Sequence, residues 1–282
     1  MASWDMTTAT SLHRPPRHPY VILGLLVLSQ VVAGLLWWRL GWRWGLSAMV
    51  ASHLTVVWAT LYPRATLFCP ALSRLPVAGR QVWLTIDDGP SADTLPMLDL
   101  LDRHGAKATF FLVGERAQAQ PELVREIQRR GHGIGNHSAS HPDRWFWALG
   151  PWQLECEISR NQAILTDIAG QPPRWFRSVV GMTNPFVGLS LHRHGLARVA
   201  WSARGFDGVQ CRPEQVLGRI RRDIAPGAIV LLHEGAAHGH NIAILAQLLD
   251  WLQAQDYRSV LPEELEAIGV VEHLPATDPA TA

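Results

Sequence analysis

Two adjacent carboxylates, Asp87 and Asp88, follow a short apolar run over residues 82–86 and precede Gly89-Pro90. The β-branched and aromatic residues of that run predict a buried strand, and the Gly-Pro pair predicts the turn that ends it. Neighbouring carboxylates repel each other, so a fold retains such a pair when a cation or a proton relieves the repulsion. A metal site is one interpretation. The other is a strand-end turn whose side chains accept backbone N–H groups, and for this dipeptide alone the turn is favoured.

Two imidazoles, those of His137 and His141, occur four residues apart in a second polar segment. On a helical turn this spacing places both rings on one side, where their neutral nitrogens can bind one divalent ion. A single histidine is usually a solvated or satisfied side chain, but this pair combined with an upstream Asp-Asp strand end favours metal binding. Two histidines and one carboxylate leave coordination positions open for water and substrate, as a catalytic site requires.

Five short segments, taken in order, resemble the motifs of the polysaccharide deacetylase family, also called the NodB homology domain or carbohydrate esterase family 4. They are residues 85–90, residues 137–142, residues 176–177, Asp207 and residues 231–233. The resemblance extends from residue 80 to residue 268 and covers essentially the whole chain beyond its apolar N-terminal region. The first two motifs are specific to the family, whereas the last three are short and support the resemblance mainly because they occur in the family's order.

The resemblance implies a role for each residue of the site. Asp88, His137 and His141 match the metal ligands, with zinc as the expected ion, and Asp87 matches the general base. The alternative in which both aspartates bind the ion stays open. Three further matches concern orientation and proton transfer: Arg177 holds the base, His233 is the general acid for the departing amine, and Asp207 orients His233. For Asp207 a plain turn role is equally favoured.

Two motifs depart from the family pattern. After Arg177 the family has two prolines, an aromatic residue and a glycine, whereas this chain has Ser-Val-Val-Gly over residues 178–181. The family's oxyanion donor is the backbone N–H at the place of Val180, and a backbone group survives a change of side chain. The tryptophan that usually follows the fourth-motif aspartate is Gly208 here. These changes remove rings from the substrate groove.

Four aromatic residues follow the histidine segment: Trp145, Phe146, Trp147 and Trp152. Such rings stack on sugar faces, meet lipid, or pack a core beneath a long loop, and the last interpretation is as favoured as the other two together. We take Trp145 as a candidate substrate contact. The lost motif aromatics and the apolar N-terminus suggest an N-acetylated sugar on a lipid carrier rather than chitin or bulk peptidoglycan.

The N-terminal region differs in composition from the rest of the chain. Residues 1–19 form a polar tail, residues 20–38 contain no charge, and residues 46–62 form a second, weaker uncharged stretch. Each is long enough to cross a membrane as a helix, so residues 20–62 are predicted to be a transmembrane helical hairpin. A single span followed by a buried helix is the alternative, and a signal peptide is disfavoured because no small-residue cleavage pattern follows. Arginines outside the hairpin outnumber those between its helices, which places both ends on the cytoplasmic face of a bacterial inner membrane.

Strand and helix patterns alternate from residue 80 onward, which predicts a parallel sheet with helices outside it. The site residues fall at strand ends, in agreement with a barrel whose chemistry lies at its carboxyl-terminal rim. The family resemblance specifies a distorted (β/α) barrel of about seven strands. We expect a linker at residues 63–79, the catalytic domain at 80–268 and a disordered tail at 269–282.

Composition narrows the class of protein further. A net charge of +1 on 282 residues gives no electrostatic case for nucleic acid, and the hydrophobic fraction of 48% is enough for a sizeable core. The three cysteines, Cys69, Cys156 and Cys211, match no zinc spacing and cannot all pair, so we expect reduced packing residues, which favours a cytoplasmic compartment. The prediction is a metal-dependent hydrolase that removes an N-acetyl group from a sugar in a glycan or on a lipid. A catalytically inactive carbohydrate-binding barrel at the membrane is the alternative.

Overall fold

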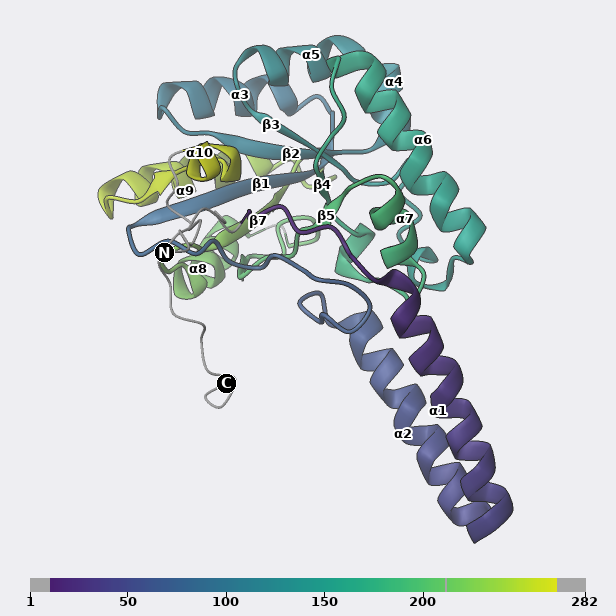
Figure 1. The fold of residues 1–282 in the computed structure, drawn as a ribbon. Helices are drawn as coiled ribbons and strands as arrows, with labels where there is room; N and C mark the ends of the chain where they lie inside the picture. The colour runs from purple at the N-terminus through teal and green to yellow at the C-terminus, as the bar shows by residue number, and fades with distance from the viewer. Residues whose placement is uncertain (1–10, 211, 268–282) are drawn as a thin grey trace, which may run out of the picture.

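A parallel sheet forms the centre of the computed structural model, which describes residues 11–210 and 212–267 (Figure 1). Seven strands are hydrogen-bonded in the order β5-β4-β3-β2-β1-β7-β6, and an eighth pairs with the start of β1. The expected distorted barrel of about seven strands is thereby confirmed as a curled half-barrel. The strands are β1 (Gln81–Gly89), β2 (Ala108–Leu112), β3 (Gly133–Asn136), β4 (Trp175–Phe176), β5 (Ala197–Arg198), β6 (Ala203–Arg204), β7 (Ile229–His233) and β8 (Arg258–Ser259).

Helices cover the outer face of this sheet, and proline or glycine residues set several of their ends. A proline occupies the first turn of α5, α6 and α8, where its missing N–H has no intrahelical partner to lose. Gly170 ends α6 in the left-handed conformation (φ 73°), which glycine adopts without strain. The helices of the domain are α3 (Thr94–Arg103), α4 (Gly114–Ala119), α5 (Pro121–Arg129), α6 (Pro151–Ala169), α7 (Val187–Arg193), α8 (Pro213–Asp223), α9 (Asn241–Ala254) and α10 (Pro262–Ala267).

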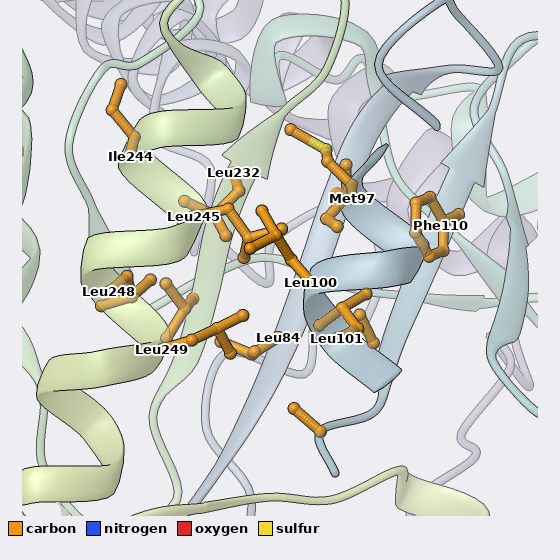
Figure 2. Close-up of a cluster of buried hydrophobic side chains, with 14 of the residues drawn as sticks. Leu84, Met97, Leu100, Leu101, Phe110, Leu232, Ile244, Leu245, Leu248 and Leu249 are labelled. Carbon is orange, nitrogen blue, oxygen red and sulfur yellow. The ribbon is translucent and has the colours of Figure 1, made fainter. Parts of the chain in front are cut away.

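Strand alternation divides the core into an outer and an inner part. Along β1, Leu84 and Ile86 face outward and join the cluster that packs under α3 and α9 (Figure 2). Trp83, one position away, belongs instead to the inner cluster of the half-barrel. Because side chains alternate along a strand, Asp87 continues the inward-facing row at the carboxyl end.

The packing of Phe111 in the inner cluster depends on a glycine in β3, the strand next to β2. Gly135 of β3 is the register partner of Phe111 in β2. A Cβ atom at Gly135 would lie 2.5 Å from two carbons of the fully buried Phe111 ring. Glycine therefore provides the space that the Phe111 ring occupies inside the half-barrel.

Two long apolar helices, α1 (Pro19–Leu40) and α2 (Trp42–Leu61), form a hairpin that projects from the α/β domain (Figure 1). Their 22 and 20 residues correspond to about 33 and 30 Å of helix, close to the roughly 30 Å of a hydrocarbon core. By length and composition both could cross a membrane. Most of their large apolar side chains are exposed, and a hydrogen bond of 2.9 Å joins Gln30 to Ser52 across the hairpin.

Residues 63–79, expected to be a linker, lie against the sheet. Leu72 pairs with Val199 beyond β5, and Arg74 pairs with Ala228 before β7, so this segment contacts both sides of the open half-barrel. Leu75 within it is buried in the inner cluster. The segment is therefore part of the domain's packing as well as a connection.

Residues 11–18 of the expected polar tail also pack on the domain. His13 Nε2 lies 3.0 Å from the carbonyl oxygen of Arg174, and Ser11 Oγ donates to Glu266 at 2.9 Å. Of the cysteines, Cys69 is buried and Cys156 is partly exposed, and both are free. Cys211, residues 1–10 and the C-terminal tail lie outside the described residues.

Candidate active site

Asp87 and Asp88 both line one pocket, although strand alternation would send adjacent side chains to opposite faces. The register explains this, because Asp87 pairs with Phe111 while Gly89 pairs with Leu112, which leaves Asp88 as an extra residue. Asp88 has a left-handed backbone with φ 71°. A bulge of this kind re-aims a side chain, and here it brings the second carboxylate to the same side as the first.

The two predicted histidines join Asp88 through a loop rather than a helix. Residues 137–142 form an irregular loop, with left-handed backbones at Ser138 (φ 68°) and His141 (φ 55°). The loop brings the ring centroids of His137 and His141 to 5.1 Å without a helical turn. Asp88 Oδ1 lies 2.9 Å from His141 Nε2 and 3.4 Å from His137 Nε2.

The donor set of this triad fits a divalent cation. One ligand atom from each of Asp88, His137 and His141 lies within 4.8 Å of the others. Asp88 Oδ1 is buried without a hydrogen-bond partner among the described residues. Burial raises the pKa of Asp88, but the two facing imidazoles more than reverse this and hold it well below its usual range. An ionised, buried oxygen between two imidazole nitrogens is the arrangement that a metal ion satisfies.

A hydrogen bond from its other ring nitrogen orients His137 toward Asp88. His137 Nδ1 lies 2.8 Å from the carbonyl oxygen of Arg177, so that ring nitrogen donates and Nε2 is directed toward Asp88. A hydrogen bond from the far nitrogen of a histidine to a carbonyl is the usual way in which proteins fix the tautomer of a metal ligand.

Arg177 holds Asp87 from inside the half-barrel. Its fully buried guanidinium donates from Nη1 to Asp87 Oδ1 at 2.8 Å and to Thr85 Oγ1 at 2.7 Å. Its Cζ atom lies 4.2 Å from the centroid of the Phe111 ring. Burial lowers the pKa of Arg177, and the charge of Asp87 opposes that shift. Asp87 Oδ2 remains outside this pair, 3.8 Å from His137 Nε2.

His233 faces the other side of the pocket. It is the register partner of Asp87 across β7 and β1, so the two side chains emerge side by side. Its Nδ1 lies 2.9 Å from Asp207 Oδ1, and its backbone N–H donates to Asp207 Oδ2 at 2.7 Å. Burial lowers the pKa of His233, but the charge and hydrogen bond of Asp207 outweigh it and raise the pKa to about 9. The imidazole is therefore protonated at neutral pH, with Nε2 free of Asp207.

The pocket around these residues has a volume of about 220 Å³. Val180 lines it with a left-handed backbone (φ 47°), an unusual conformation for a β-branched residue and one that clusters at functional sites. Gly208 lies where the family has tryptophan, and a Cβ atom there would sit 3.4 Å from the His233 ring. Trp145 is 65% exposed and is not among the residues that line the pocket.

Several residues of the site have no clear signal in the sequence. Glu234 is buried directly after His233, accepts a hydrogen bond of 2.8 Å from Ser91, and also accepts one from Thr94. Burial raises the pKa of Glu234 to about 7. A side chain at Gly89 would collide with Glu234, so this carboxyl group packs against the turn that carries the aspartates. Arg204 and Phe206, which line the pocket, were also not anticipated.

The end of the apolar hairpin contacts the wall of the pocket. The backbone N–H of Thr183 donates to the carbonyl oxygen of Thr60 in α2 at 3.1 Å. Gly181, which lines the pocket, has so little space that a Cβ atom there would lie 2.9 Å from Pro63, the second residue after α2. The pocket therefore lies beside the base of the hairpin.

A carboxylate and two imidazoles at the carboxyl ends of a parallel half-barrel, flanked by an arginine-held carboxylate and a protonated histidine, define a metal-dependent hydrolase of the (β/α)-barrel class. Comparison with known proteins specifies the family. A family model described as polysaccharide deacetylase matches residues 74–199. A chitooligosaccharide deacetylase from Bradyrhizobium sp. is 35% identical over 162 residues, which cover 57% of this chain and 73% of that protein.

Two further similarities agree. A peptidoglycan-N-acetylglucosamine deacetylase from Bacillus cereus is 32% identical over 195 residues, covering 64% of this chain and 86% of that protein. A crystal structure of a CE4 family pseudoenzyme from Bacillus anthracis superimposes with a TM-score of 0.62 at 26% identity, covering 69% of this chain and 68% of that one. The chain belongs to the polysaccharide deacetylase family and is a hydrolase of carbon–nitrogen bonds other than peptide bonds.

Proposed function

We propose that this protein removes the N-acetyl group from an amino sugar carried on a lipid, at the surface of the bacterial inner membrane. Asp88, His137 and His141 hold zinc, Asp87 is the general base and His233 is the general acid. The observation that carries the proposal is the convergence of the triad, the Asp87–Arg177 pair and the His233–Asp207 pair on one pocket.

Amide hydrolysis needs a nucleophilic water, a polarised carbonyl and a proton for the leaving amine. A zinc ion at the triad supplies a Lewis acid that makes the carbonyl more electrophilic and a nearby water more acidic. Asp87 Oδ2 is free to take the proton of the attacking water because Arg177 engages Oδ1. The carbon–nitrogen bond then breaks, and His233 gives its proton to the sugar nitrogen, which leaves acetate and a free amine. The backbone N–H of Val180 stabilises the developing oxyanion.

Arg177 and Asp207 act through the base and the acid. Arg177 fixes the rotamer of Asp87 by a hydrogen bond to Oδ1, and Asp207 fixes the tautomer of His233 and keeps it protonated. Removal of one partner from a buried ion pair typically costs about 3–5 kcal/mol, because the remaining charge is left unpaired. Loss of either residue should therefore disturb folding as well as activity.

The hairpin favours a substrate presented by the membrane. Because α2 ends beside Thr183 and Gly181, a sugar attached to a lipid would not have to leave the membrane surface to reach the pocket. Exposed apolar side chains of Val180, Phe206 and Val209 at the same pocket would meet the hydrocarbon or the headgroup region. We propose that both ends of the hairpin are cytoplasmic, with residues 20–62 as the anchor.

The test is deacetylation by the full-length protein in detergent micelles. We expect acetate release from a polyprenyl-linked N-acetylamino sugar, together with a mass loss of about 42 units, one acetyl group, and much slower release from soluble chitooligomers. Equal rates on both substrates would refute the lipid-linked substrate. The alternative function, an inactive carbohydrate-binding barrel, would bind sugar without releasing acetate, and H141A is the matched control because it removes one triad ligand.

A further inference from the structure

Arg204, the second residue of β6, lines the catalytic pocket and lies close to two aromatic rings. Its Cζ atom is 3.9 Å from the centroid of the Phe206 ring and 5.0 Å from that of Trp201. Stacking on an aromatic ring engages the face of a guanidinium and leaves the N–H groups in its plane for other partners. Phe206 holds this position with a left-handed backbone (φ 66°), an outlier for an aromatic residue of the type found at ligand-binding sites.

Within residues 11–210 and 212–267 no carboxylate forms an ion pair with Arg204. Its Nε atom is buried there without a hydrogen-bond partner. The carboxylates of Asp87 and Asp207 already have partners. Asp87 pairs with Arg177 at 2.8 Å, and Asp207 pairs with His233 at 2.9 Å. The charges of Asp207 and Asp87 act on Arg204 from a distance and oppose the lowering of its pKa by burial. Neither carboxylate bonds to its N–H groups, so an anion from outside this part of the chain would supply the partner that the buried Nε lacks.

The size of the pocket limits where that anion can be attached. At about 220 Å³ the pocket is below the roughly 300–1,000 Å³ of common ligand sites, so it accommodates about one sugar residue with its nearest substituent. With the acetamido group at the triad, a substituent on the adjacent anomeric carbon stays within the same pocket, which Arg204 also lines. The planar fork of arginine matches phosphate oxygens with two parallel hydrogen bonds.

We propose that Arg204 is a specificity residue that binds a phosphate ester attached to the acetamido sugar. This inference rests on the proposed deacetylation of a sugar at the triad and adds the chemical group that distinguishes its substrate from neutral glycans. Phe206 and Trp201 hold the guanidinium in the orientation that presents its fork to the phosphate.

The experiment compares three substrates with the full-length protein in detergent micelles: N-acetylglucosamine 1-phosphate, the same sugar phosphate linked to a polyprenol, and neutral N,N′-diacetylchitobiose. R204Q should lower kcat/KM for both phosphorylated substrates by at least about tenfold more than for the neutral one, the size expected for a lost charge-assisted hydrogen bond. R204K keeps the charge without the fork and should give an intermediate loss.

Arg219 provides the matched control. Its Cζ atom lies 5.4 Å from the same Phe206 ring, but its Nη1 donates to the carbonyl oxygen of Gly205 and it does not line the pocket. R219Q should leave the ratio of the two kcat/KM values unchanged. A change in R219Q as large as in R204Q would overturn the proposal, because packing on Phe206 would then explain both.

A binding measurement adds a readout that is independent of turnover. By calorimetry, glucosamine 1-phosphate should bind the wild-type protein at least about tenfold more tightly than glucosamine, and R204Q should abolish that difference. Equal losses for charged and neutral substrates would overturn the role of Arg204, as would an effect confined to the polyprenyl substrate. Absence of deacetylation of all three substrates by the wild-type protein would instead refute the proposed function.

Discussion

Replacement of Asp207 by asparagine tests the acid side of the proposed mechanism. In the structure burial lowers the pKa of His233, but Asp207, together with smaller contributions from Asp87 and Asp88, raises it from 6.5 to about 9. D207N removes the charge but keeps an oxygen that can accept from the backbone N–H of His233. Without the carboxylate, the largest contribution that opposes burial is lost. The charges of Asp87 and Asp88 still raise the pKa of His233, so we expect it to fall back toward 6.5.

The size of the effect follows from the fraction of His233 that is protonated. With a pKa of about 9, roughly 90% is protonated at pH 8, whereas with a pKa of 6.5 only about 3% is protonated. At pH 6 the protonated fraction of His233 differs less than about twofold between the wild-type protein and D207N. The ratio of activity at pH 8 to activity at pH 6 should therefore be roughly twentyfold lower in D207N than in the wild-type protein.

Acetate release measured from pH 5.5 to pH 9.5 checks this prediction. D250N is the matched control, because Asp250 pairs with His104 at 3.0 Å on the surface and neither residue lines the pocket. An alkaline limb of the activity profile that stays in place in D207N, or an equal loss of activity at pH 6 and pH 8, would refute the assigned role of Asp207.

The free energy of unfolding depends on pH for the same reason. The stabilisation from protonated His233, up to about 3 kcal/mol, is complete below pH 6.5 and is lost as the pH rises through about 9.

Three further predictions concern the metal, a buried carboxyl group and the anchor. D88N should lose its zinc, from about one ion per chain to nearly none by elemental analysis, and its activity should fall at least about 100-fold; full zinc content in D88N would contradict the triad. Wild-type stability should fall by up to about 3 kcal/mol between pH 4.5 and about 7, because burial raises the pKa of Glu234 and its ionisation then disfavours the folded state. Thermal unfolding of E234Q should lack this decline, and an undiminished decline would assign it to other groups. Deletion of residues 1–62 should move the protein from the membrane fraction to the soluble fraction, and retention in the membrane would point to a second attachment surface.

Local sequence signals predicted most of the fold. Prolines at residues 151 and 213 and the glycine at residue 170 are ordinary signals of helix ends, and they stand at ends of α6 and α8. The short strands β6 and β8 escaped prediction, because two residues carry no periodicity of their own and the pairing partner alone defines them. The contacts of residues 63–79 with Val199 and Ala228 were equally hidden, since an irregular segment has no pattern that reveals its neighbours.

The residues assigned to the proposed mechanism were named from motifs, but their arrangement was not. Strand register brings Asp87 beside His233, and a bulge turns Asp88 to the same side, neither of which a spacing argument can show. The loop of His137 and His141 is built on left-handed residues rather than a helical turn, and the four-residue spacing alone does not reveal that conformation. Glu234 and Arg204 act through tertiary contacts only, and no local pattern distinguishes them from surface charges.

The close fit of Gly135 against the Phe111 ring has a consequence for how far the catalytic apparatus extends. Phe111 lies beneath the Arg177 guanidinium, which in turn grips Asp87, so one missing methyl group in β3 is the first member of a chain of contacts that ends at the base. An alanine at this position would displace the Phe111 ring toward Arg177. The substitution would thereby disturb the position of Asp87 although residue 135 does not contact the substrate. The part of this sequence under catalytic constraint therefore includes a residue that has no side chain at all.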